Sequence, residues 1–222
     1  MKGYNKMTQH ELLRMREEQH KIKNIISEKD DVIAKTAAEI CVKLLSEKYP
    51  NHTFNLKKTL TVPEIRKYAK IEIDDEWNDR KIIPDGGIIW MDNKYPILTT
   101  EMKHQGTNVE RLAEGKKKQA TGNAIERYGK NLIGFHTLYQ NDDILPVVAF
   151  CHGCDFADDE KTVLMKLYTL NGLNKTNIIY TNPTKQRIKP SSILYKTEIW
   201  KIEEMVPIMM KIAESAIDYY SR

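Results

Sequence analysis

The spacing of hydrophobic residues predicts helices near both ends of the chain. In residues 31–47 the apolar positions recur every three or four residues, and Asp30 or Asp31 is placed to cap the start of this helix. The preceding segment, residues 8–28, is charged and only loosely periodic, so it is either a dimerisation arm or a solvated helix. Residues 198–220 are again amphipathic and predict a closing helix.

The middle of the chain has the pattern of β-strands. Residues 88–91 and 95–103 are apolar runs joined by a short turn, which predicts a hairpin covered on both faces. The break Pro84-Asp85-Gly86-Gly87 comes directly before this hairpin, and a polar helical stretch interrupted by glycines follows it at 109–139. Further short elements are expected at 144–150, 161–170 and 177–180. Because strands alternate with helices, we expect an α/β fold.

Composition narrows the class of protein. A chain of 222 residues with 41% hydrophobic and 30% charged residues fits one globular domain, with residues 1–29 as a candidate helical arm. It has no run of eighteen apolar residues and its N-terminus lacks an apolar signal core, so we expect a cytoplasmic protein without a membrane span. The net charge of +4 permits a polyanionic partner such as nucleic acid.

The cysteines do not predict a disulfide or a metal centre. An odd total of three is a poor disulfide framework. The segment Cys151-His152-Gly153-Cys154 looks like half of a zinc site, but the sequence offers no second ligand pair at usable spacing. We interpret it as a strand end followed by a turn.

Three residues around the predicted hairpin carry candidate chemistry. Glu101 and Lys103 are two apart on a strand, so both side chains leave on the same face. The hairpin can bring Asp85 beside Glu101. Two carboxylates can hold Mg²⁺, and a lysine can neutralise the charge that develops when water attacks a phosphodiester.

The Glu-x-Lys pattern alone is common, and a second copy occurs at Glu114-Gly115-Lys116. This copy lies in a polar helical stretch without strand context, so it serves as an internal control. The alternative interpretation of Glu101 and Lys103 is a surface salt bridge on an edge strand. The apolar strand residues around them favour the catalytic interpretation, because a charged pair at the end of a buried strand needs a compensating role.

Three blocks occur in order over about fifty residues: Pro84-Asp85-Gly86-Gly87-Ile88, then Glu101-x-Lys103-His104-Gln105-Gly106, then Gly122-Asn123-Ala124-Ile125-Glu126-Arg127. In these blocks the chain resembles the EcoRI-type type II restriction endonucleases of the PD-(D/E)xK superfamily. The resemblance implies a central mixed β-sheet flanked by helices. The chain departs from the family pattern at Ile83, where lysine is expected, and in a shorter stretch between Gly106 and Gly122.

The resemblance also implies a cofactor, site residues and partners. Asp85, Glu101 and the main-chain carbonyl of Met102 would hold Mg²⁺, and Lys103 would be the catalytic lysine. The enzyme would be a homodimer that cuts double-stranded DNA at a short palindrome. A matching DNA methyltransferase is expected in the same cell.

The third block would lie in the major groove and read an AATT core. The residues implied in DNA binding are Gln105, Ala120, Asn123, Ala124, Glu126 and Arg127. Asparagine can bond bidentately to adenine, and alanine can contact the thymine methyl group. The alternative for this block is a solvated helix capped by Asn123. Later in the chain, Arg187 and Lys189 are candidates for guanine or phosphate contacts, or belong to an ordinary basic loop.

Two rival functions remain at this point. A PD-(D/E)xK repair or junction-resolving nuclease would share the fold but read DNA shape, so it would not need the third block. A non-catalytic DNA-binding protein would not need Asp85, Glu101 and Lys103 together. Cleavage at discrete sequences on plasmid DNA separates the restriction enzyme from both.

Overall fold

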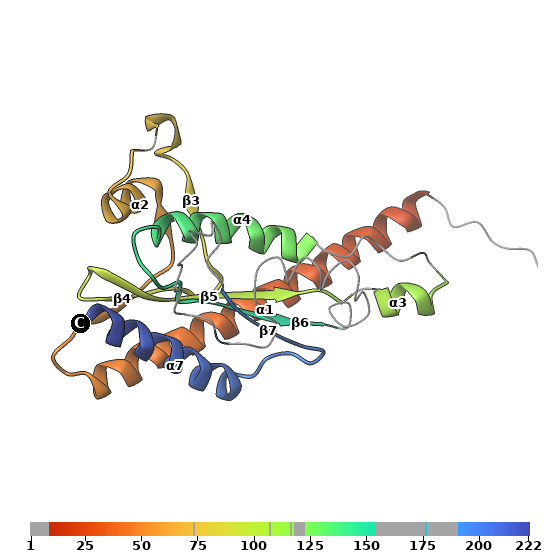
Figure 1. The fold of residues 1–222 in the computed structure, drawn as a ribbon. Coiled ribbons are helices and arrows are strands. Elements are labelled where there is room, and N and C mark those ends of the chain that lie inside the picture. The colour runs from red at the N-terminus through yellow and green to blue at the C-terminus, as the bar shows by residue number, and fades with distance from the viewer. Residues whose placement is uncertain are drawn as a thin grey trace, which may run out of the picture.

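A five-stranded mixed sheet, in the order β1-β4-β5-β6-β7, forms the centre of the computed structural model (Figure 1). The structure describes residues 9–72, 74–106, 108–115, 117, 123–153, 176 and 191–222. The strands are β1 (Phe54–Lys57), β4 (Gly87–Met91), β5 (Tyr95–His104), β6 (Val147–His152) and β7 (Ser192–Lys196). β4 is antiparallel to both β1 and β5, whereas β5, β6 and β7 are parallel. The predicted hairpin and the α/β class are both confirmed.

Helices cover both faces of this sheet. On one face lie α1 (Gln9–Lys48) and α7 (Ile202–Tyr220), and on the other lies α4 (Asn123–Leu138), with α2 (Val62–Ala69) packed beside it (Figure 1). The smaller elements are β2 (Leu60–Thr61), η1 (Asp75–Trp77), β3 (Lys81–Ile82), which pairs with β2, and α3 (Asn108–Ala113). No helix in the described part of the chain is long and apolar enough to span a membrane.

Two hydrophobic cores lie on opposite faces of the sheet. Alternate residues of a strand point to opposite faces, so Ile89 and Met91 pack with α1 and α7, whereas Ile88 and Trp90 pack with α2 and α4. Both faces are therefore covered, which explains why this strand has a continuous apolar sequence.

Helix α1 differs from its prediction. The charged segment and the amphipathic segment form one continuous helix, so the expectation that Asp30 or Asp31 caps a new helix is wrong. Asp30 is buried and its Oδ2 atom lies 3.0 Å from His152 Nε2 on β6, so its carboxylate has a partner in the sheet instead. The N-terminal end of α1 extends beyond the sheet (Figure 1).

The later elements agree with the sequence pattern apart from their ends. Strand β6 continues to His152 because it pairs in register with β5 as far as His104. Helix α7 begins at Ile202, four residues after the predicted start at Glu198. The elements expected at 161–170 and 177–180 lie outside the described residues.

Candidate active site

The turn before β4 brings Asp85 beside Met102, near the C-terminal end of β5. Gly87 has a positive φ of 78°, and a Cβ atom on Gly86 would lie 2.8 Å from the Thr100 side chain, so both positions require glycine. The Gly86 amide donates to the Thr100 carbonyl at 2.9 Å. The turn is thereby fixed against β5, and Asp85 Oδ2 accepts a hydrogen bond of 2.8 Å from the Met102 amide.

Strand β5 supplies the other two predicted catalytic residues. Glu101 is fully buried, and its Oε1 atom accepts a hydrogen bond of 2.8 Å from Asn131 Nδ2 of α4. Lys103 leaves on the same face because it is two residues further along the strand. Met102 points to the opposite face, into the core with α1 and α7. Asp85, Glu101 and Lys103 are therefore brought together as predicted.

The Lys103 ammonium group lies at the centre of the site and donates hydrogen bonds to three oxygen atoms. It donates to Asp85 Oδ2, to Glu101 Oε2 at 2.6 Å and to the Met102 carbonyl at 3.1 Å. Its side chain is 12% exposed, against 20% for Asp85 and 0% for Glu101, so solvent reaches the site from the Asp85 side. Three oxygen atoms thus surround one positive charge.

Burial affects the pKa values of both Glu101 and Lys103. Burial raises the pKa of Glu101 to about 7, and the negative charge of Asp85 adds to this, while Lys103 partly offsets it. Burial lowers the pKa of Lys103, but the charges of Glu101 and Asp85 outweigh it and leave the pKa above its ordinary value. Lys103 is therefore protonated at neutral pH while both carboxylates contact it.

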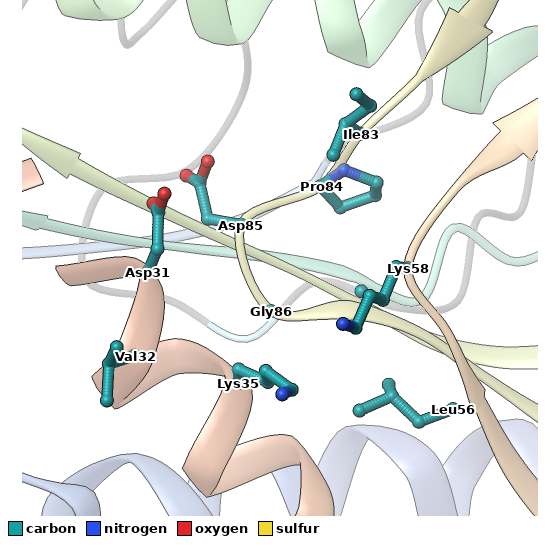
Figure 2. Close-up of a pocket in the computed structure, with 10 residues that line it drawn as sticks. Asp31, Val32, Lys35, Leu56, Lys58, Ile83, Pro84, Asp85 and Gly86 are labelled. Carbon is teal, nitrogen blue, oxygen red and sulfur yellow. The ribbon is translucent and has the colours of Figure 1, made fainter. Parts of the chain in front are cut away.

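A third carboxylate, Asp31 of α1, lies at the edge of this site. Figure 2 shows the Asp31 and Asp85 carboxylates side by side, at one end of a pocket. Partial burial and the negative charge of Asp85 raise the pKa of Asp31. Three carboxylates against one lysine make the local field negative, which favours a bound cation.

Comparison with known protein families matches the region that contains this site. The profile of the family described as "Restriction endonuclease EcoRI" matches residues 18–166, which is about two thirds of the chain. The chain belongs to the EcoRI restriction endonuclease family. The match includes α1 from residue 18 onward, the whole hairpin, α4 and β6.

Two curated relatives agree with the EcoRI family assignment. The type II restriction enzyme RsrI of Cereibacter sphaeroides is 24% identical over 235 aligned positions, covering 86% of this chain and 84% of RsrI. The type II restriction enzyme EcoRI of Escherichia coli is 26% identical over 151 positions, covering 60% of this chain and 54% of that enzyme. The resemblance inferred from the three sequence blocks is confirmed at the level of the family.

The DNA-binding residues implied by the EcoRI family pattern are described only in part. Helix α4 begins at Asn123, and Glu126 and Arg127 are exposed in its first turns. An α-helix rises 1.5 Å per residue, so the start of α4 lies about 12 Å along the helix from Asn131, the partner of Glu101. The side chains of Asn123 and Ala124, and the residues Ala120, Arg187 and Lys189, lie outside what the structure describes.

Gln105 follows directly after β5. Its backbone amide donates to the His152 carbonyl at 2.9 Å, and Gly153 lies so close that a Cβ atom there would be 2.2 Å from the Gln105 carbonyl oxygen. The Oε1 atom of Gln105 is buried and has no hydrogen-bond partner within the described part of the chain.

The segment Cys151-His152-Gly153-Cys154 is a strand end, as interpreted from the sequence. Cys151 is buried in β6, and burial raises the pKa of its thiol to about 12. His152 pairs with Asp30, and its ring lies against that of His104 with centroids 4.7 Å apart. Cys154 lies outside the described residues.

Sequence reasoning missed two residues that lie at the candidate site, Asn131 and Asp31. Asn131 lies beside the buried face of α4, which is formed by Tyr128, Leu132 and Phe135. A polar residue next to that apolar face was a visible signal in the sequence. Asp31 offered no such signal, because its position beside Asp85 depends on how α1 packs against the sheet.

Proposed function

We propose that this protein is a type II restriction endonuclease that cleaves both strands of a short palindromic DNA site with Mg²⁺. The observation that carries the proposal is that Asp85, Glu101 and the Met102 carbonyl all accept hydrogen bonds from the Lys103 ammonium group. These residues lie inside the region that matches the EcoRI family. This arrangement matches the needs of phosphodiester hydrolysis.

The oxygen atoms at the site fit a divalent metal. Asp85 Oδ2, Glu101 Oε2 and the Met102 carbonyl oxygen are hard ligands of the type that Mg²⁺ prefers. In the structure they hold the ammonium group of Lys103 instead, with distances that include 2.6 Å to Glu101 and 3.1 Å to Met102. When bound there, Mg²⁺ would polarise the phosphate and lower the pKa of a coordinated water.

The protein residues have separate roles in this proposal. Lys103 stays protonated, so it neutralises the oxyanion charge that develops on the attacked phosphate. Asn131 fixes the orientation of the Glu101 carboxylate through its bond to Oε1, leaving Oε2 directed at the shared cation position. Asp85 is held by the Met102 amide, so both carboxylates are oriented before substrate binds.

Recognition of the DNA sequence is assigned to the start of α4. Asn123 would bond to adenine and Ala124 would contact thymine methyl groups in the major groove, with Ala120, Gln105, Glu126 and Arg127 completing an AATT core. Arg187 and Lys189 are assigned to flanking guanines or phosphates. Since a palindrome has twofold symmetry, the protein would act as a homodimer. The host cell would protect its own sites with a DNA methyltransferase.

Plasmid cleavage tests this proposal. A supercoiled plasmid with a single palindromic AATT-containing site is incubated with the protein and Mg²⁺, and a parallel sample contains a chelator. We expect full-length linear DNA with Mg²⁺ and intact plasmid with the chelator. Accumulation of open circles alone, or cleavage confined to branched DNA, would favour a repair or junction-resolving nuclease.

Sedimentation of the protein on a duplex with this site tests the homodimer separately. The proposal predicts two protomers on each duplex at micromolar concentration. One protomer per duplex with normal double-strand cleavage would contradict the twofold arrangement.

A further inference from the structure

A half-open pocket of about 200 Å³ begins at Asp85 and extends away from the catalytic residues. One wall comes from α1, another from the residues at the end of β1, and the third from the turn that precedes β4 (Figure 2). The pocket is therefore continuous with the site proposed for cleavage, but most of its lining has no role in that chemistry.

Charges of opposite sign occupy the two ends of this pocket. The carboxylates of Asp31 and Asp85 lie together at one end (Figure 2). The side chains of Lys35 and Lys58 enter the other end from opposite walls, with their ammonium groups in the space between them (Figure 2). The pocket is thus suited to a ligand with two neighbouring anionic groups, one bound through a metal ion at the carboxylates and the other bound by the lysines.

Both lysines are available to a ligand. Lys58 is exposed and makes no ion pair with any residue in the described ranges. Lys35 lies 3.4 Å from Glu39 on the same helix, with side chains 44% and 55% exposed. Exposed pairs at this spacing contribute little to stability, so a phosphate can replace Glu39 as the partner of Lys35.

The two glycine amides of the turn at the base of the pocket already have acceptors within the protein. The Gly86 amide donates to Thr100 and the Gly87 amide donates to the Pro84 carbonyl at 3.0 Å. An anion in the pocket therefore depends on the lysine side chains for its positive charge.

The rim of the pocket includes two exposed apolar residues. Val32 and Ile83 line it and are 63% and 52% exposed, although apolar residues of this size are usually covered. A chain in which charged phosphates alternate with apolar sugar carbons presents the matching surface: anions for the lysines and C–H groups for the rim.

We propose that this pocket binds the sugar–phosphate backbone of the cleaved DNA strand, with Lys35 and Lys58 on a phosphate next to the scissile one. The proposal rests on the proposed function, because it places the scissile phosphate at Asp85 and Glu101. The acidic end accepts a phosphate only through a metal ion, whereas the basic end accepts the neighbouring phosphate directly. The contact positions the strand and carries no sequence information.

The dependence of DNA binding on salt measures such contacts. Each phosphate neutralised by a lysine contributes about 0.9 to the slope of log K against log salt concentration. We would measure fluorescence anisotropy of two labelled duplexes, one with an AATT palindrome and one with the same bases scrambled, in a chelator so that no cleavage occurs. The variants are Lys35→Gln/Lys58→Gln, the charge-conserving Lys35→Arg/Lys58→Arg, and wild type.

Lys43→Gln is the matched control. Lys43 lies on the same helix and pairs with Glu47 at 4.0 Å with exposed side chains, as Lys35 does with Glu39, but it does not line the pocket. In the double glutamine variant the magnitude of the negative slope is expected to fall by about 0.9 for each phosphate that is no longer neutralised. Binding of both duplexes is expected to weaken by the same factor. The double arginine variant and Lys43→Gln are expected to match wild type, and thermal unfolding of all variants is expected to be unchanged.

Each outcome separates this proposal from the proposed function. Suppose that wild type binds and cuts DNA. If the double glutamine variant then has the same slope as Lys43→Gln, or loses binding to the AATT duplex while it still binds the scrambled duplex, the pocket assignment is overturned and the endonuclease stands. If binding shows the lysine-dependent slope but Mg²⁺ produces no cleavage, the endonuclease is overturned, and only the binding of a DNA phosphate by Lys35 and Lys58 stands. A wild-type protein that binds neither duplex overturns both.

Discussion

The sequence Glu-x-Lys occurs at two places in this chain, on strand β5 and after helix α3. On β5, Glu101 is fully buried and its carboxylate shares the Lys103 ammonium group with Asp85. After α3, Glu114 is exposed in a turn, and the following Gly115 has a φ of 68°. A strand directs residues two apart to one face, whereas a turn with a left-handed residue has no such rule. The same three-residue pattern thus lies in two unlike environments.

Burial gives the β5 copy its chemistry. Electrostatic interactions are stronger where water is excluded, so charge held beside Glu101 has a larger effect than charge held beside an exposed carboxylate. The raised pKa of Glu101, at about 7, is a direct sign of this environment. A short motif therefore carries little functional meaning until the strand, the burial and the second carboxylate are known.

The largest effect is expected when the two copies are substituted in parallel. Asp85→Ala and Glu101→Gln each remove a proposed metal ligand, so cleavage of a single-site plasmid should fall by at least roughly a thousandfold. Glu114→Gln should retain the wild-type rate, as measured by the same assay. Equal losses at Glu101 and Glu114, or near-normal cleavage by Glu101→Gln, would contradict the assignment of the site.

A second substitution separates chemistry on β5 from sequence reading at the start of α4. Asn123→Ala should cost about 1–3 kcal/mol of discrimination at one adenine, which is about 5- to 150-fold in relative cleavage rate. Competition between the AATT site and sites with single base changes measures this. If preference at every base is unchanged, Asn123 does not belong to the reading set.

A smaller effect is expected from the helix that supports Glu101. Asn131→Ala leaves Glu101 Oε1 without its 2.8 Å hydrogen bond, and removal of a bond to a buried charged group costs about 1.5–3 kcal/mol. Cleavage should therefore fall about tenfold or more, and because that bond lowers the pKa of Glu101, the acid limb of the pH–rate profile should move to higher pH. A reduced rate with an unmoved profile would indicate a structural role alone.

The smallest effect is expected in how the Mg²⁺ requirement for cleavage varies with pH. Protons and Mg²⁺ compete for Glu101, whose pKa is about 7, so the Mg²⁺ concentration for half-maximal cleavage should rise as pH falls from about 8 to about 6. Saturating Mg²⁺ should restore the rate. A Mg²⁺ requirement that does not vary over this range would place the metal away from Glu101.

The raised pKa of Glu101 also makes the stability of the metal-free fold depend on pH, and this stability is expected to fall as pH rises. The folded pKa lies above the ordinary value of 4.5, so the neutral form is favoured in the fold and its stabilising effect is lost as pH rises from about 4.5 to about 7. Glu101→Gln removes this titration. Denaturant unfolding of the metal-free protein across this range measures it, with Glu114→Gln as the control.

Much of the site could be predicted because it is local in sequence. Asp85, Glu101 and Lys103 belong to one hairpin, whose strands and turn are visible as apolar runs around a glycine-rich break. The period of two on β5 fixed the shared face of Glu101 and Lys103. These features needed no knowledge of how distant segments pack.

The residues that were missed depend on long-range packing. Asp31 lies beside Asp85 only because α1 crosses the sheet, and Asp30 was expected to cap a helix but pairs with His152, 122 residues away. Asn131 contacts Glu101 because α4 covers the face on which the charged residues lie. Tertiary contacts such as these override local signals, and local signals were all the sequence pattern could supply.

Sequencing of fragment ends tests the central claim most directly. A long, fully sequenced, unmethylated DNA is digested with wild-type protein and Mg²⁺, with Glu101→Gln in parallel, and the ends are sequenced. The account predicts discrete wild-type ends that share an AATT core, with their outer base pairs defined, and almost no ends from Glu101→Gln. Ends spread without a common sequence, or the same ends from both proteins, would contradict it.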